Sequence, residues 1–439
     1  MKINKSLLSI HLNEFNFSFL KYGAKRYKCE NIKKYLKLNK VKTYTIDKIQ
    51  DKDLDPWVQS VSINLGENSK KHKSYKIGQN VSKKQTQIWD YLSKKKIKCG
   101  VWGAMNSRFN KNKYLKFYFP DPWNNSELPY PKNLEKFFYL PRSYAQKYTD
   151  FKITKEKINL LNFFLGCIQF GIFSYFIKKF SLYFKVFYNT GLKNYFLFFL
   201  FDIISLKILQ KLSKNNIDFS LIFLNSLAHY QHNNWDEKKN HWKYFLLVDE
   251  IFNIINQIQK NYDSIIIFNG MSQKKIKKEF IIRPKNFNKF FKNLDIRYKK
   301  ILPDMTTGGF IYFNSLIERK NSLKILENYN LYGFKIFEIK IINKLKIYFR
   351  IQIKSSTKKN MIKNTNFKDV INYEKNSQKK QIRKINYNFK KFLKDTIFLK
   401  TTGKHVSSGD LLHENMRFPK KKFENIKIYS TIKNYFFST

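Results

Sequence analysis

Two histidine segments, far apart in the chain, offer the clearest candidates for chemistry. His229 and His232 lie in S-L-A-H-Y-Q-H-N-N-W-D at 226–236, and His405 lies in T-T-G-K-H-V-S-S-G-D-L-L at 401–412. Histidine is scarce, with seven residues against 85 Lys and Arg, yet these three follow apolar runs typical of buried strands. The HxxH spacing brings two imidazoles together on a helical turn. With His405 they could form a three-histidine site with an open fourth position, as in zinc sites that activate water.

A structural role for the same histidines is the alternative. In that interpretation His232 and His405 hydrogen-bond across a cleft and His229 packs, because HxxH alone is a common spacing. His72 lies among lysines and is expected to be a solvated loop residue rather than a general base. The histidine segments therefore predict a metal site or the remains of one.

Further candidates lie in two loops. The proline-rich stretch 119–133 is expected to be a rigid loop, because each proline fixes its own φ and restrains its predecessor. Asp121 and Trp123 in this loop could line a substrate pocket, or Trp123 could anchor the loop in the core. Thr306 and Thr307 precede a Gly-Gly pair that could bind an anion through backbone N–H groups, although such pairs are also common in turns.

Apolar runs alternate along the chain with helical patterns. Runs that predict strands cover 6–12, 97–102, 217–224, 263–268, 334–340, 345–353 and 396–400. Helical patterns cover 17–36, 82–96, 242–261 and 319–330. This alternation predicts an α/β fold with a mostly parallel central sheet and helices on both faces. In such a sheet ligands bind beyond the carboxyl ends of the strands, where the histidine segments are expected.

One elaborated domain over 1–439 is expected, with two additions. Helices over 155–212 form an insertion, and the Lys-, Asn- and Ser-rich stretch 354–392 is expected to be a flexible excursion. Residues 158–177 have the length of a membrane span, but two asparagines and a glutamine lower their apolarity. We expect buried or amphipathic helices there and no transmembrane segment; a spanning or surface-seeking role is the alternative.

The composition narrows the function classes. The net charge of +53 suggests nucleic acid or an anionic membrane surface as partner. The charge is nearly all lysine, however, which is typical of an AT-rich genome, whereas arginine suits phosphates and guanine edges better. We therefore expect no specific nucleic-acid partner. Three cysteines without metal or redox spacing, and an N-terminus without a secretory signal, favour a cytoplasmic protein.

Five segments, taken in chain order, resemble those of a known superfamily. They are S-I-H-L-N-E-F near the N-terminus, D-P-W-V-Q-S-V-S-I-N-L-G-E-N-S-K-K-H at 55–72, A-H-Y-Q-H at 228–232, I-I-I-F-N-G-M-S-Q at 265–273, which lacks the Asp and His of the superfamily, and G-K-H at 403–405. The superfamily is that of alkaline phosphatase, which contains the sulfatases and the nucleotide pyrophosphatase/phosphodiesterases. The chain resembles its divergent bacterial sulfatase-like members, and the resemblance implies an alkaline phosphatase-like fold.

The resemblance also implies roles for single residues. His232 and His405 match metal-binding histidines, and Asn13 stands where the superfamily has a metal-binding aspartate. Glu14 stands at the glycine that follows and is a further candidate ligand, since it could compensate for the lost carboxylate if the turn rotates. Ser60 and Ser62 are the hydroxyls nearest to the nucleophile position. Superfamily enzymes hold two divalent metals, but most carboxylates are replaced in this chain. A reduced site is therefore expected, with zinc or another divalent metal.

Three functions follow from these residues. The first is hydrolysis or transfer of a phosphate or sulfate ester group, with a small anionic ester or a glycan-linked compound as substrate. The second is that of a catalytically inactive pseudoenzyme, which keeps the fold to bind an anionic ligand or partner. The third is nonspecific nucleic-acid binding through lysine charge.

Overall fold

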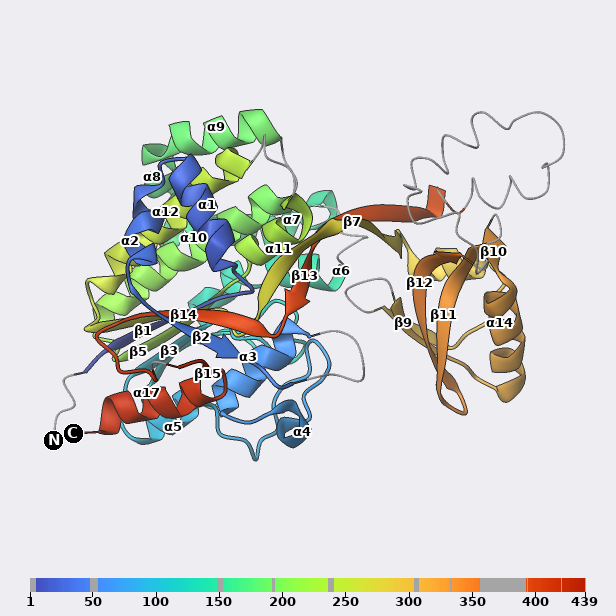
Figure 1. Ribbon diagram of the computed structural model, residues 1–439, viewed down its shortest axis with the longest axis horizontal. Coiled ribbons are helices and arrows are strands. Elements are labelled where there is room, and N and C mark those ends of the chain that lie inside the picture. Colours follow the sequence, from blue (N-terminus) through green and yellow to red (C-terminus); the bar gives the residue numbers. More distant parts are fainter. Residues whose placement is uncertain are drawn as a thin grey trace. The chain divides into compact units, whose positions relative to one another are not determined.

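Two units make up the chain. Unit 1 comprises Met1–Lys277 and Thr402–Thr439, and unit 2 comprises Lys278–Thr401. The structure, a computed structural model, describes residues 5–47, 54–147, 153–191, 194–235, 241–303, 308–331, 334–355, 392, 394–419 and 421–438 (Figure 1). The expectation of one elaborated domain over 1–439 does not distinguish unit 2 from unit 1. The excursion expected over 354–392 lies almost entirely outside the described residues.

Unit 1 is built on an eight-stranded sheet in the order β15-β2-β14-β6-β1-β5-β3-β4. In the middle of this order β1 pairs in parallel with both β5 and β6, and β3 pairs in parallel with β5 and β4. Only β14 runs antiparallel to its neighbours. The predicted α/β fold with a mostly parallel sheet is therefore confirmed. The strands are β1 (Leu7–Leu12), β2 (Asn39–Tyr44), β3 (Cys99–Trp102), β4 (Leu115–Phe119), β5 (Phe219–Leu224), β6 (Ser264–Phe268), β14 (Ser408–Glu414) and β15 (Phe423–Glu424).

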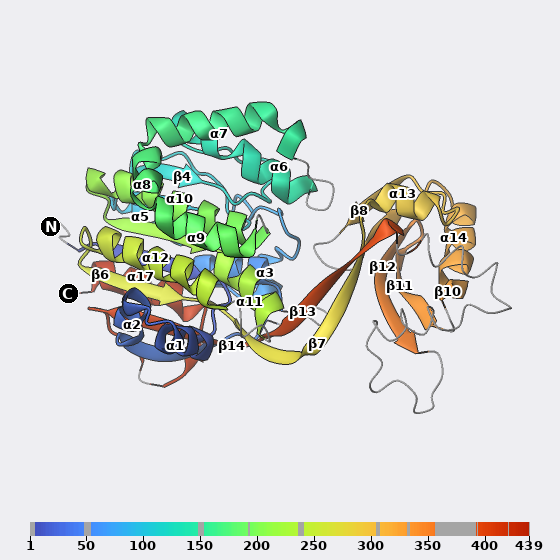
Figure 2. The ribbon, with the colours of Figure 1, turned by 90° about the horizontal axis from the view of Figure 1, so that it is seen from above.

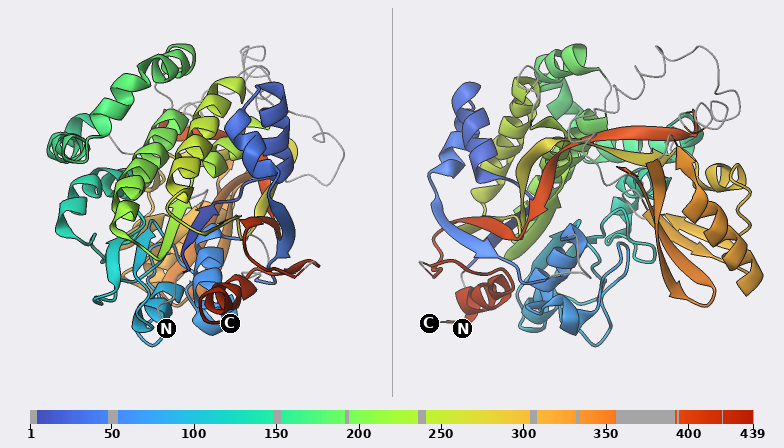
Figure 3. Two further views of the ribbon diagram at one scale, coloured as in Figure 1. Left: turned by 90° about the vertical axis from the view of Figure 1, so that its left-hand side faces the viewer. Right: turned by 45° about the vertical axis from the view of Figure 1, so that its right-hand side comes forward.

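Helices cover both faces of this sheet, as the left view of Figure 3 shows. Every residue of β1 is buried, because its alternating side chains enter two different cores. Leu8, Ile10 and Leu12 pack against α1 (Phe17–Arg26), α2 (Glu30–Leu36), α10 (Asn194–Leu212) and α12 (His241–Gln259). Leu7 packs in the opposite core with α3 (Pro56–Leu65), α5 (Ile88–Lys94) and α17 (Lys427–Phe437).

The helical insertion expected over 155–212 consists of four α-helices: α7 (Lys157–Gln169), α8 (Ile172–Lys178), α9 (Phe180–Thr190) and α10. The segment 158–177 is not one helix, because α7 and α8 meet at 82° around Gly171, which has a φ of 56°. Among the residues that the structure describes, no single helix has the length and apolarity to cross a membrane, although the bent pair α7 and α8 would meet both criteria together. The remaining helices of unit 1 are α4 (Ser69–His72), α6 (Tyr139–Lys147) and α11 (Ser226–Asn234).

Unit 2 contains a five-stranded sheet in the order β10-β11-β12-β9-β8, with antiparallel pairs throughout. The strands are β8 (Lys300–Pro303), β9 (Gly308–Tyr312), β10 (Asn330–Leu331), β11 (Phe334–Asn343) and β12 (Lys346–Ser355). Its own core joins them to α13 (Phe287–Lys292) and α14 (Leu316–Asn328). The chain leaves unit 1 along β7 (Ser272–Pro284) and returns along β13 (Thr396–Val406), and these two strands pair with each other.

Candidate metal centre

Glu14, His232 and His405 meet at one edge of the sheet in unit 1. Glu14 is the second residue after β1, and His232 lies on α11, which follows β5. Because β1 and β5 are parallel neighbours, both chains leave the sheet at the same edge. His405 lies near the end of β13, which leads into β14. Since β14 runs antiparallel to β6, its beginning lies at the edge where β6 ends.

The placement of His405 differs from the expectation. The strand predicted over 396–400 continues through His405 as β13, and β13 pairs with β7 outside the central sheet. His405 is therefore a strand residue and does not lie in a loop beyond a strand of the main sheet. The antiparallel direction of β14 nevertheless brings it to the predicted edge.

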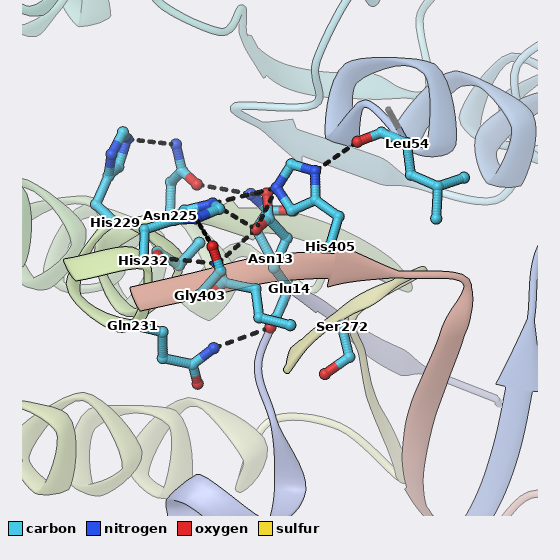
Figure 4. A network of polar contacts seen from close by, with 12 residues as sticks. Asn13, Glu14, Leu54, Asn225, His229, Gln231, His232, Ser272, Gly403 and His405 are labelled. Carbon is cyan, nitrogen blue, oxygen red and sulfur yellow. Dashed lines mark hydrogen bonds and ion pairs between the residues drawn. The ribbon is translucent and has the colours of Figure 1, made fainter. Parts of the chain in front are cut away.

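Three potential ligand atoms form an almost equilateral triangle (Figure 4). Glu14 Oε2 lies 3.0 Å from His232 Nε2 and 3.0 Å from His405 Nε2. The two Nε2 atoms are 3.1 Å apart. The side chain of Glu14 is 3% exposed, against 29% for His232 and 21% for His405. The carboxylate is thus buried beneath two imidazoles that solvent can reach.

The other nitrogen of each ring decides where the protons lie. His405 Nδ1 faces the backbone carbonyl of Leu54, and His232 Nδ1 faces that of Gly403 at 3.4 Å. A carbonyl can only accept, so each Nδ1 carries hydrogen, and in a neutral ring Nε2 then holds a lone pair. Two imidazole lone pairs and a carboxylate oxygen thus converge, and this arrangement requires a cation or a proton between them. Backbone carbonyls that orient histidine ligands in this way are usual around metals.

The pKa shifts of His405 and Glu14 agree with a cation or a proton shared among the three residues. Burial by itself would lower the pKa of His405, but the charge of Glu14 and its hydrogen bond outweigh burial and raise that pKa to about 9. Burial would raise the pKa of Glu14, yet His405 and His232 together hold it well below its usual value. Without metal, the cluster therefore keeps one proton on His405 beside an ionised Glu14. One carboxylate oxygen and two imidazole nitrogens are a donor set that zinc accepts, so the residues fit a divalent metal.

The turn after β1 explains how Glu14 reaches this position. Glu14 has a φ of 52°, a left-handed conformation that is uncommon for residues other than glycine. The conformation is held by Gln231 Nε2, which donates to the Glu14 backbone carbonyl at 3.1 Å, and by Gln273 Nε2, which donates to Oε2 at 2.6 Å. At this position the side chain of Glu14 points into the site.

Asn13 and His229 lie beside the triangle and are linked to it by hydrogen bonds through Glu14 and Asn225. Asn13 Nδ2 donates to Glu14 Oε1 at 3.3 Å and to Asn225 Oδ1 at 2.7 Å, and Asn225 Nδ2 lies 3.1 Å from His229 Nε2. The His229 ring stacks on Phe198 with centroids 4.1 Å apart. Burial lowers the pKa of His229 to about 4. The structure thus brings together three of the five predicted ligands and places Asn13 and His229 behind them.

The two candidate nucleophiles, Ser60 and Ser62, are fully buried inside α3. Ser62 Oγ lies 2.9 Å from His72 Nε2 and donates to the carboxylate of Asp47. His72 Nδ1 accepts from the backbone N–H of Ser74 at 3.0 Å, so the proton of the neutral ring lies on Nε2 and points at Ser62. The histidine is therefore a donor and cannot activate this serine.

His72 itself differs from the expectation. It was predicted to be a solvated loop residue, but it lies in α4 and is 5% exposed. Burial lowers its pKa, so the ring is neutral and serves the packing of α3 against α4.

The predicted substrate residues have structural partners where they are described. Asp121 is buried, and its two carboxylate oxygens accept from the backbone N–H groups of Asn106 and Trp123 at 2.9 Å each. Burial raises the pKa of Asp121 to about 7. Asp121 thus organises the proline-rich loop, and Trp123 within it is partly exposed. Thr306 and Thr307 lie outside the described residues.

Two contributors were missed in the sequence. Gln273, in N-G-M-S-Q after β6, fixes the Glu14 carboxylate. Gly403 lets β13 lie close to α11 and β7, because a Cβ there would approach Gln273 Oε1 to 2.6 Å and Trp235 Nε1 to 2.8 Å. The signal for Gly403 was its place two residues before His405. The sequence contains no such signal for Gln273, because a neutral glutamine is not a residue type that marks a metal site.

Comparisons with known proteins give likenesses of structure. No family model matches the chain, and no curated protein matches its sequence. Human ectonucleotide pyrophosphatase/phosphodiesterase 5 is similar at 10% identity and a TM-score of 0.43, over 98% of this chain and 94% of the other. Phosphonoacetate hydrolase from Sinorhizobium meliloti 1021, in complex with phosphonoformate, is similar at 8% identity and a TM-score of 0.41, over 98% and 96%. Both belong to the alkaline phosphatase superfamily.

Proposed function

We propose that unit 1 is a metal-dependent hydrolase or transferase for phosphate or sulfate ester groups, with one divalent cation held by Glu14, His232 and His405. The observation that carries the proposal is the convergence of three potential ligand atoms within 3.1 Å of one another at the carboxyl edge of the sheet. A cation bound there would polarise an ester oxygen and lower the pKa of a water molecule. Zinc suits this donor set, and the open side of the imidazoles leaves a position for substrate.

The surrounding residues support this role by holding the ligands before metal arrives. Gln273 and Asn13 fix both oxygens of the Glu14 carboxylate, and two backbone carbonyls fix the imidazole tautomers. Neither Ser60 nor Ser62 can act as nucleophile from inside α3, so we assign attack on the ester to water. We propose a small anionic substrate, a glycan-linked ester included, because a divalent cation at this site would attract an anionic group.

A binding function without catalysis has one observation in its favour. The protonated His405 donates from Nε2 to Glu14 and from Nδ1 to Leu54, so the cluster is satisfied by a single proton. A pseudoenzyme could keep the same residues as a buried ion pair and use the edge of the sheet to bind an anionic ligand.

Metal analysis with matched variants tests the proposal. Purified full-length protein should bind one zinc or manganese ion per chain, and hydrolysis of an activated phosphodiester or sulfate ester should follow occupancy. The pair His232→Ala and His405→Ala should abolish both, while His229→Gln should retain the metal because His229 stands outside the triangle. Stoichiometric metal that survives the double substitution would refute the assignment. Metal binding without hydrolysis of any ester would favour the binding role.

A further inference from the structure

The outer surface of the helical insertion carries an unusual number of exposed apolar side chains. On α7 the residues Ile158, Leu161, Leu165 and Ile168 are 75%, 57%, 42% and 54% exposed. Their spacing of three, four and three places them along one side of the helix. The opposite side holds the helix in place, since Gly166 and Cys167 are buried.

A second stripe lies on α9. Phe180, Phe184, Phe187 and Tyr188 are 65%, 51%, 40% and 77% exposed, at a spacing that again selects one face. Phe180 stacks on Phe184 at 5.6 Å and Phe184 on Tyr188 at 6.0 Å, so the aromatic rings form a row. The other face of α9 is buried through Tyr183, Val186 and Thr190. Figure 1 shows α9 at the top edge of unit 1, and Figure 2 shows α7 along its outer side.

Both helices depart from the pattern that is usual for a surface helix of a soluble protein. Such a helix normally buries its apolar face and exposes a polar one. Here the helices are apolar on both sides, and contiguous exposed apolar surface of this kind marks an interaction site. Phe164 on α7 touches Phe173 on α8, with ring centroids 4.5 Å apart, so the apolar surface continues from one helix to the next.

The charges around this surface indicate what covers it. From Lys157 to Phe201 the sequence contains lysines but no aspartate or glutamate. Lys157 and Lys178 are exposed at the ends of α7 and α8. A second copy of this face would set lysine against lysine without a compensating acid. An anionic lipid surface offers the complementary charge together with an apolar layer for the aromatic and aliphatic side chains.

We propose that the exposed apolar face of α7–α9 docks unit 1 on an anionic lipid bilayer, with the side chains of α7 and α9 in the interfacial layer and the lysines at the headgroups. The site is independent of the metal cluster. The sequence predicts buried or amphipathic helices here, with a spanning or surface-seeking role as the alternative, and the proposal adopts the surface-seeking role because these apolar side chains are exposed. Interfacial helices of this type combine a large apolar face with flanking lysines.

Vesicle sedimentation of the full-length protein tests the proposal. Wild type should bind vesicles of phosphatidylcholine with 30% phosphatidylglycerol at least tenfold more tightly than vesicles of phosphatidylcholine alone. The variant Leu161→Asn/Phe184→Asn/Tyr188→Asn should lose at least tenfold of this affinity. A matched control is Ile317→Asn/Ile341→Asn, which removes apolar side chains that are 71% and 54% exposed in unit 2. The control should bind as wild type does, and circular dichroism should show all three proteins folded.

Three results would overturn the proposal. Equal loss in the α7–α9 variant and in the control would show that apolar exposure in general causes binding. A wild-type dimer that the α7–α9 substitutions convert to monomer would identify a second copy as the occupant. Retention of the protein in vesicles after carbonate extraction at high pH would mean that the bent pair α7 and α8 spans the bilayer.

Discussion

His232 Nε2 and His405 Nε2 lie 3.1 Å apart although both rings present their Nδ1 atoms to backbone carbonyls. Two imidazoles oriented in this way hold lone pairs toward each other, which is unfavourable unless a proton or a metal ion lies between them. Glu14 Oε2, at 3.0 Å from each nitrogen, makes the third corner. The same three residues can therefore exist as a protonated ion pair or as a metal site, and the following predictions separate the two states.

Replacing the carboxylate should weaken the metal site without removing its hydrogen bonds. Glu14→Gln keeps an oxygen near both histidines but loses the charge, and a neutral amide is a poor ligand for a divalent cation. We expect zinc affinity to fall by more than roughly 100-fold, which is a larger loss than substitution of a residue that only hydrogen-bonds a metal ligand causes. Competition with a chromogenic chelator measures it. Unchanged zinc affinity in Glu14→Gln would mean that the carboxylate is not a ligand.

Gln273 should affect the metal by positioning Glu14 and the helix α11, which carries His232. Its amide donates to Glu14 Oε2 at 2.6 Å and to the backbone carbonyl of Ala228 at 3.1 Å. Gln273→Leu should lower zinc affinity by about 10- to 100-fold, as is typical for outer partners of a ligand. The neighbouring Ser272→Ala is the control, since Ser272 donates to the carbonyl of Phe15 and not to a ligand. Equal affinities in the two variants would exclude this positioning role.

The metal-free protein should lose stability as the pH rises. The pKa of His405 is lowered by burial but raised more by Glu14, to about 9 from 6.5. A raised folded-state pKa contributes stability that is complete below about pH 6.5 and is lost as the pH rises through about 9. The shift corresponds to at most about 3 kcal/mol of unfolding free energy.

Denaturant unfolding in EDTA between pH 6 and pH 10 measures this loss. His405→Gln should flatten the curve relative to wild type, since glutamine has no proton to lose. Zinc should reverse the trend in wild type, because metal binding displaces the proton and becomes tighter as the pH rises. A His405→Gln curve that falls as steeply as that of wild type would place the titrating group elsewhere.

The sheet and the residues of the triangle can be predicted from the sequence, the histidines from their own pattern and Glu14 from the resemblance alone. The apolar runs of β1, β5 and β6 are readable because these strands are buried on both faces. His232 and His405 stand out as scarce residues next to such runs. The sequence does not show how Glu14 reaches the site, because its position depends on a left-handed backbone held by two glutamines from distant segments.

Other features were hidden because they depend on tertiary contacts. Helices α7 and α9 have the apolar composition of core helices, and only the fold reveals which of their faces is exposed. The Ser62–His72 contact resembles a catalytic pair until the hydrogen bond to Ser74 fixes the tautomer.

Asp202 should control the position of His232 from another helix. Its Oδ2 accepts the backbone N–H groups of Asn225 at 3.1 Å and Ser226 at 2.8 Å, and so caps the beginning of α11. Asn225, the N-cap residue of α11, makes no side-chain cap bond itself and instead reaches Asn13 and His229. Asp202→Ala leaves two buried N–H groups without their acceptor. We expect a loss of about 2 kcal/mol of unfolding free energy and a weaker zinc site, since α11 carries His232.

Asp202→Asn is the matched variant, because its amide oxygen can still accept while the charge is gone. Burial raises the pKa of Asp202 to about 7, so the ionised form is disfavoured in the folded protein. The asparagine should therefore retain most of the stability and the zinc affinity near neutral pH. Unfolding curves and chelator competition on both variants decide the matter. If the asparagine lost as much as the alanine, the carboxylate charge rather than the cap would be what α11 requires.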